Sequence, residues 1–156
     1  MKRQGSWPVL LLALVFGAAS GAGAAPGAAP DTARAALPAR AEAGDAKAAY
    51  RLGLMARNGT GTAGEAMPAD PANARALLSE AAEGGVPAAM FVLANMLAAG
   101  EGGPRDEAAA RRWLETAAAL DYPEALQQLA LTEPDPHKAE LLMRQAAHAM
   151  THRAPD

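Results

Sequence analysis

A ten-residue pattern recurs three times in this chain, and such a recurrence limits the possible folds more than any other feature. The copies begin at Gly44, Gly85 and Asp121, so the first offset is 41 residues and the second is 36. Each copy has alanine four positions after its start and leucine eight positions after it, a spacing typical of one helix face. We therefore expect an array of similar units rather than an ordinary single-core domain.

A second helix is expected after the first in every copy. It is opened by Asp70, Asp106 and Asp135, each with alanine four positions later. An aspartate at this point is a strong N-cap, because its carboxylate accepts the free N–H groups of the first turn. The expected helices span about 46–57, 71–83, 87–99, 106–120, 123–132 and 136–150.

Helices alternating in this way predict an all-α solenoid of two-helix units. The repeat domain should cover 41–150, with units at about 44–84, 85–120 and 121–150 and a frayed tail at 151–156. Unit one carries a five-residue insertion within 62–69, by comparison with unit two. Unit three lacks the Gly-x-Gly loop of the other two, so we expect two good repeats and one degenerate C-terminal repeat, which suits a cap.

Residues 1–24 have the layout of a secretory signal peptide. Lys2 and Arg3 precede an apolar run, and Ala22-Gly23-Ala24 forms a cleavage site. The run is too short to span a bilayer comfortably, so we expect cleavage near Ala24 and no integral membrane span, with an uncleaved anchor as the alternative. The protein is then a periplasmic or secreted bacterial protein.

The segment 25–40 is rich in alanine and proline and is expected to be a flexible leader. A capping helix is a candidate toward its end, at 33–43, although Pro38 argues against it.

Composition excludes several classes of function. The chain has no cysteine, which removes disulfides, thiolate metal sites and a cysteine nucleophile. Its formal net charge is −3 and it has no basic block, so nucleic acid is a poor candidate partner. After the leader the only serine is Ser79, which has no G-x-S-x-G motif around it.

The remaining polar groups have structural explanations. The glycine-rich loops 58–61 and 100–103 lack the strand and the Lys-Ser/Thr of a phosphate loop, so they are expected to be turns. Glu101, Asp106 and Glu107 are expected to form a solvated helix cap. His148 and His152 could share a metal on one helix face, but two histidines make a poor zinc site, so no metal and no cofactor is expected.

The sequence at 48–59, followed by Asp70, Ala74 and Ala81-Ala82-Glu83-Gly84, resembles the Sel-one-like repeat, a unit related to the tetratricopeptide motif. The resemblance covers about 41–150, and Trp113 stands at the usual aromatic position of the second helix. It implies a right-handed α/α solenoid that serves as a protein-binding scaffold, in bacteria often in the envelope or secreted.

We therefore expect a non-catalytic extracytoplasmic scaffold that binds a protein or peptide of the envelope, with self-association as a further option. First helices build the concave face of a solenoid. The expected groove residues are Lys47, Arg51, Val92, Asn95 and Gln128, whereas Ala48, Leu52, Met55 and Ala56 should face the core. The alternatives are a small envelope hydrolase of the β-lactam-processing type, for which no nucleophile–base pair is visible, and a histidine-based metal carrier.

Overall fold

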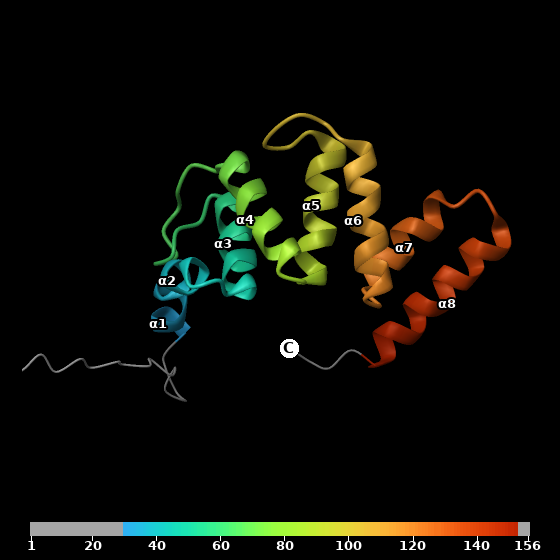
Figure 1. The fold of residues 1–156 in the computed structure, drawn as a ribbon. Coiled ribbons are helices and arrows are strands. Elements are labelled where there is room, and N and C mark those ends of the chain that lie inside the picture. The colour runs from blue at the N-terminus through green and yellow to red at the C-terminus, as the bar shows by residue number, and fades with distance from the viewer. Residues whose placement is uncertain (1–29, 153–156) are drawn as a thin grey trace, which may run out of the picture.

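The computed structural model describes residues 30–152, and the expected signal peptide at 1–24 lies outside them. The described helices are α1 (Pro30–Ala35), α2 (Leu37–Glu42), α3 (Ala46–Asn58), α4 (Pro71–Glu83), α5 (Pro87–Ala99), α6 (Glu107–Ala119), α7 (Pro123–Thr132) and α8 (Pro136–His152). The pairs α3–α4, α5–α6 and α7–α8 stand side by side in an arch (Figure 1). The expectation of an all-α helical-repeat solenoid is confirmed.

Aspartate side chains start four of these helices. Asp70 accepts a hydrogen bond from the backbone N–H of Asn73 at 3.0 Å, and Asp106 does the same for Ala109 at 2.8 Å. Asp45 caps α3 and Asp135 caps α8 in the same manner. These bonds satisfy first-turn N–H groups that have no partner within the helix, so the capping residues fix where each helix begins.

The two short N-terminal helices close the first unit. Pro38 lies in the first turn of α2, where a helix tolerates proline because that N–H has no partner within the helix. Leu37 and Ala41 are buried, and α2 packs against α3. This end of the array is therefore covered by the chain itself.

The residues expected on the core face of α3 do pack against the core, but most of them are not its most deeply buried positions. Ala48 is buried, but Leu52, Met55 and Ala56 are only partly buried, and the other fully packed positions are Ala49 and Gly53. A Cβ at Gly53 would lie 2.8 Å from Cγ of Leu78 on α4. The missing side chain lets α4 approach closely, so the buried face of α3 is turned toward Ala49 and Gly53.

Glu101 joins two units, and its expected role as a solvated cap is wrong. Its carboxylate accepts two hydrogen bonds from Arg57 of α3, each 2.8 Å long. The two side chains are 29% and 35% exposed. The guanidinium of Arg57 holds the pKa of Glu101 below its usual value, and the carboxylate raises the pKa of Arg57.

Replacing Glu101 with glutamine should lower the free energy of unfolding by about 1 kcal/mol near neutral pH, because the charged pair is bidentate but about one third exposed. The pKa of Glu101 is lowered on folding, so this stabilisation is present above about pH 5 and is lost as the pH falls below about 4. Thermal unfolding of both proteins across this range checks the prediction.

The matched control is Glu115→Gln. Its partner Arg111 lies four residues away on the same helix and both side chains are more than half exposed. A surface pair of this kind contributes little, so the melting temperature should hardly change. Equal losses from the two variants, or a Glu101 effect that persists in acid, would contradict the assigned role of the pair.

Candidate functional site

The turns between units bring the starts of α5 and α7 to one edge of the arch, together with the start of α3 and the end of α8 (Figure 1). An open hollow of about 780 Å³ runs along this edge and draws on all three units. We call it the underside groove. It is lined by Lys47, Tyr50, Arg51, Val86, Pro87, Ala88, Leu120, Asp121, Tyr122, Pro123, His148, Ala149 and His152.

A residue with a left-handed backbone conformation lies in the turn before each of α3, α5 and α7. Gly44, Gly85 and Asp121 occupy the equivalent position before α3, α5 and α7, with φ of +85°, +82° and +54°. Glycine adopts this conformation at little cost, whereas other residues pay for it, although aspartate tolerates it better than most. In unit three the exposed turn position therefore carries a carboxylate that lines the groove where the other units have none.

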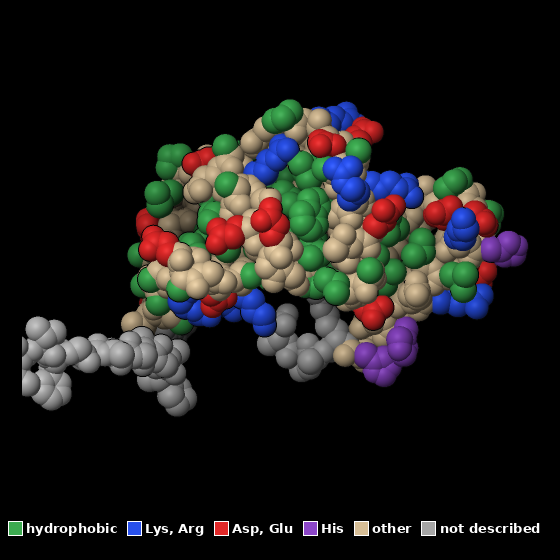
Figure 2. Space-filling model, in the orientation of Figure 1, with side chains coloured by type: hydrophobic (Ala, Val, Ile, Leu, Met, Phe, Trp, Pro, Cys, Tyr) green, Lys and Arg blue, Asp and Glu red, His purple; other side chains and the backbone are tan. Residues whose placement is uncertain are grey.

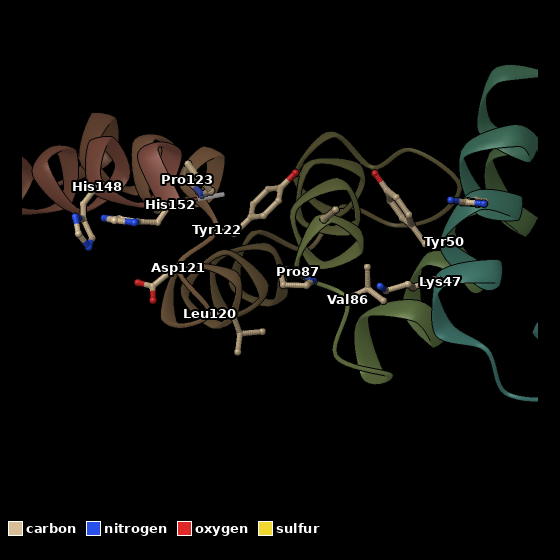
Figure 3. A pocket seen from close by; sticks show the side chains of 13 residues that line it. Lys47, Tyr50, Val86, Pro87, Leu120, Asp121, Tyr122, Pro123, His148 and His152 are labelled. Atoms are coloured by element: carbon tan, nitrogen blue, oxygen red, sulfur yellow. The ribbon is translucent and has the colours of Figure 1, made fainter. Parts of the chain in front are cut away.

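Two tyrosines form the walls of the groove's middle section. Figure 3 shows Tyr50 on the α3 side and Tyr122 on the α7 side, with Val86 and Pro87 between them. The ring of Tyr122 packs against Phe91 of α5, with ring centroids 5.7 Å apart. Aromatic side chains held in this way offer apolar contact area and lose little side-chain entropy when a partner binds.

The basic and imidazole side chains of the groove lie at its two ends. Lys47 and Arg51 are exposed on α3 at one end, and His148 and His152 are exposed on α8 at the other. The two imidazole rings have centroids 4.4 Å apart. Figure 2 shows basic and imidazole side chains along this same lower edge. Since Asp121 is the only carboxylate among the described residues that line it, the groove is suited to a partner that presents negative charge.

Two of the five groove residues named from the sequence line this hollow, namely Lys47 and Arg51. Asn95 and Gln128 instead bind each other: Nε2 of Gln128 donates a hydrogen bond to Oδ1 of Asn95, with 3.1 Å between the two atoms. This bond links α5 to α7. Val92 is half-buried and packs against the core. The structure thus places three of the five at the junctions between helices rather than in the underside groove.

Asp121, Tyr122 and the two C-terminal histidines line the groove without having been expected there. A signal for Asp121 was present in the sequence, because it stands where the other two copies have glycine. The length of α8 was predicted nearly correctly, but nothing in the sequence alone showed that its last turn lies along the same hollow as the start of α7.

Within residues 30–152, no group of three or more histidine, aspartate or glutamate side chains is arranged to hold a metal ion. The serine of this region, Ser79, donates an exposed hydrogen bond to Glu83 within α4, and neither residue lines the groove. None of the helices in the described region combines the length and apolar character needed to cross a membrane.

A second hollow of about 750 Å³ lies at the N-terminal end of the array. The half-buried Leu52 and Met55 of α3 line it, together with Pro38 and the insertion loop of unit one. That loop folds back on itself through a bridge between Thr60 and Ala66. The insertion thus covers part of the face of α3 that the packing against α4 leaves open.

Comparison with known proteins places this arrangement among helical-repeat proteins. The family model described as Sel1 repeat matches residues 46–86, 87–122 and 125–149. No curated protein matches the chain.

Two solved structures resemble the fold. A Sel1 repeat protein from Oxalobacter formigenes is 23% identical, with a TM-score of 0.62 over 69% of this chain and 44% of its own. A protective antigen present in uropathogenic Escherichia coli strains, displaying an SLR fold, is 30% identical, with a TM-score of 0.64 over 74% of this chain and 25% of its own. The chain therefore spans less than half the length of either protein.

Proposed function

This chain belongs to the Sel1 repeat family, and we propose that it is a non-catalytic extracytoplasmic scaffold that binds a protein partner along the underside groove. Sel1 repeat proteins are generally protein–protein interaction scaffolds and typically have no catalytic activity of their own. For this chain the proposal rests on one observation, namely that all three units contribute residues to the same groove.

The groove suits a peptide segment with a carboxylate at one end and apolar side chains in the middle. Lys47 and Arg51 offer cationic groups on one helix, one turn apart. Tyr50 offers an apolar face next to them, and Tyr122 offers another across Val86 and Pro87. Complementary charge of this kind orients a partner, and buried aromatic contacts supply most of the binding energy.

Reversing the charge of Lys47 and Arg51 together to glutamate should weaken binding of the native partner at least tenfold, roughly 1.4 kcal/mol or more. Both side chains are exposed, so the fold should survive, which circular dichroism checks. The measurement is quantitative capture of the partner cross-linked in the native cell.

The matched control reverses Arg111 and Arg112, two exposed arginines of α6 that do not line the groove. Capture should be unchanged in this variant. A groove variant that stays folded and retains full capture would refute the assigned surface, whereas equal losses from both variants would show that only overall charge matters.

The extracytoplasmic location is supported by the basic start, apolar run and small-residue cleavage site of residues 1–24. The full-length sequence should accumulate outside the cytoplasm as a chain that begins at Ala25, which intact mass and cell fractionation measure. Retention in the cytoplasm with the first 24 residues present would reject the location and leave the groove proposal standing.

A further inference from the structure

The hollow at the N-terminal end of the array continues into a smaller one of about 280 Å³. The two hollows share Pro38 of α2, Leu52 of α3 and Leu77 of α4, so they adjoin each other. The loop 59–70 forms a further wall, and Figure 1 shows it descending beside α2. We call the two hollows together the end trough, which is bounded on both sides by described elements of the chain.

The floor of the end trough is apolar. Leu52 and Met55 of α3 are only half-buried there. The matching residues of unit two, 41 positions later, are Leu93 and Met96, which are 2% and 0% exposed on a helix that packs against both α4 and α6. An interior unit therefore covers these positions with neighbouring helices. The floor of the trough is accordingly suited to the apolar side chains of a helical segment.

The loop wall is formed by the chain's own hydrogen bonds. The backbone N–H of Gly61 donates to the carbonyl oxygen of Glu65, and that of Met67 donates to the carbonyl oxygen of Gly59, each at 2.8 Å. The loop thus lines the trough with Met67, which is 53% exposed, and with Glu65. Because the wall is already ordered, a partner that binds against it need not pay to order it.

The charge around the trough is negative. Glu65 and Asp70 line the larger hollow, Glu42 and Glu80 line the smaller one, and all four are exposed. No lysine or arginine is among the described residues that line either hollow. Arg34 of α1 approaches the tip of the loop without lining the trough. Figure 2 shows acidic side chains over this end of the molecule, so the complementary partner carries positive charge.

We propose that the end trough binds an amphipathic helical segment of a second protein. Its apolar side chains lie on Leu52, Met55 and Met67, and lysine or arginine side chains beside them face the carboxylates at the two ends of the trough. Methionines in the lining adapt to apolar side chains of different shape. The underside groove favours negative charge, so the two surfaces hold segments of opposite charge and each can be tested without the other.

Fluorescence anisotropy with a labelled synthetic peptide tests the proposal. The peptide has about 14 residues, roughly four helical turns, with leucines on one face and lysines beside them. The protein is purified after expression of the full-length sequence, and its intact mass shows whether residues 1–24 are present. We expect saturable binding with a dissociation constant below about 100 µM.

Changing Glu65 and Glu80 together to lysine should weaken this binding roughly tenfold or more, because the two ends of the trough then repel the peptide. Both side chains are exposed, so the fold should survive, which circular dichroism checks. The matched control changes Glu107 and Glu115 of α6 to lysine, which alters the net charge equally at residues that line neither hollow. Binding by the control should stay within about twofold of the wild type at physiological ionic strength.

Met67→Gln tests the apolar contact without changing charge, and it should weaken binding about threefold or more. Leu131→Gln is its control, at an 81% exposed side chain outside the trough, and should have no effect. Absence of saturable binding overturns the proposal, as do equal losses from the two charge variants or an unchanged affinity in Met67→Gln. Binding that appears only after residues 1–24 are removed also overturns it, since the chain's own leader would then fill the trough.

Discussion

Replacement of Leu93 with alanine is expected to unfold most of the repeat array at about 37 °C, because a buried Leu→Ala change costs roughly 2–5 kcal/mol. Leu93 is 2% exposed and lies on α5, the central helix, which packs against both α4 and α6. Each unit buries its apolar face only against its neighbours, so the loss weakens two junctions at once. Circular dichroism followed against temperature measures the effect.

The matched control is Leu131→Ala, the same chemical change at a side chain that is 81% exposed on α7. It should shift the melting temperature very little. A Leu93→Ala protein that remains cooperatively folded well above about 37 °C would show that the array is not marginally stable. The packing of α2 on α3, or self-association of the chain, would then be the source of the additional stability.

Gly102→Ala should lower the free energy of unfolding by about 2–4 kcal/mol, nearly as much as Leu93→Ala, because two separate penalties act at this position. Gly102 has φ of +74°, where a side chain is strained. A Cβ at this position would also overlap the carbonyl oxygen of Pro71, the first residue of α4, so that the loop of unit two could no longer sit against unit one. Chemical denaturation gives the change in free energy.

Gly85→Ala separates the two penalties. Gly85 has φ of +82°, but no atom lies within 4 Å of where its Cβ would be. This variant should therefore show only the conformational penalty, about 1 kcal/mol. If Gly102→Ala lowers the free energy of unfolding by no more than Gly85→Ala does, the close approach between units one and two contributes nothing to stability.

Local sequence signals predicted most of the helices well. Asp70 and Asp135 are capping residues followed by proline, and Gly59 and Gly100 adopt the left-handed conformation that ends α3 and α5. These signals are local, since each depends on hydrogen bonds within one turn of the chain. The repeat offset then showed how often the unit recurs, which is why the solenoid could be predicted without a structure.

Contacts between units were much harder to predict. Glu101 has the local sequence of a solvated loop residue, and only the stacking of units brings it to Arg57, 44 positions earlier in the chain. Asn95 and Gln128 have the helix positions of groove residues, yet they bond to each other. The burial of Gly53 against Leu78 likewise depends on how closely α4 approaches α3. Such features are set by the angle between helices, which a single helical pattern does not encode.

The central claim is that the underside groove holds a protein partner, and site-specific photo-cross-linking in living cells tests it most directly. A photoreactive residue replaces Arg51 in the groove in one strain and Arg111 on α6 in another. The account predicts a discrete adduct from position 51 that is lost when Lys47 is changed to glutamate, and no such adduct from position 111. An adduct that forms equally from both positions, or none from position 51 in a folded protein, would contradict it.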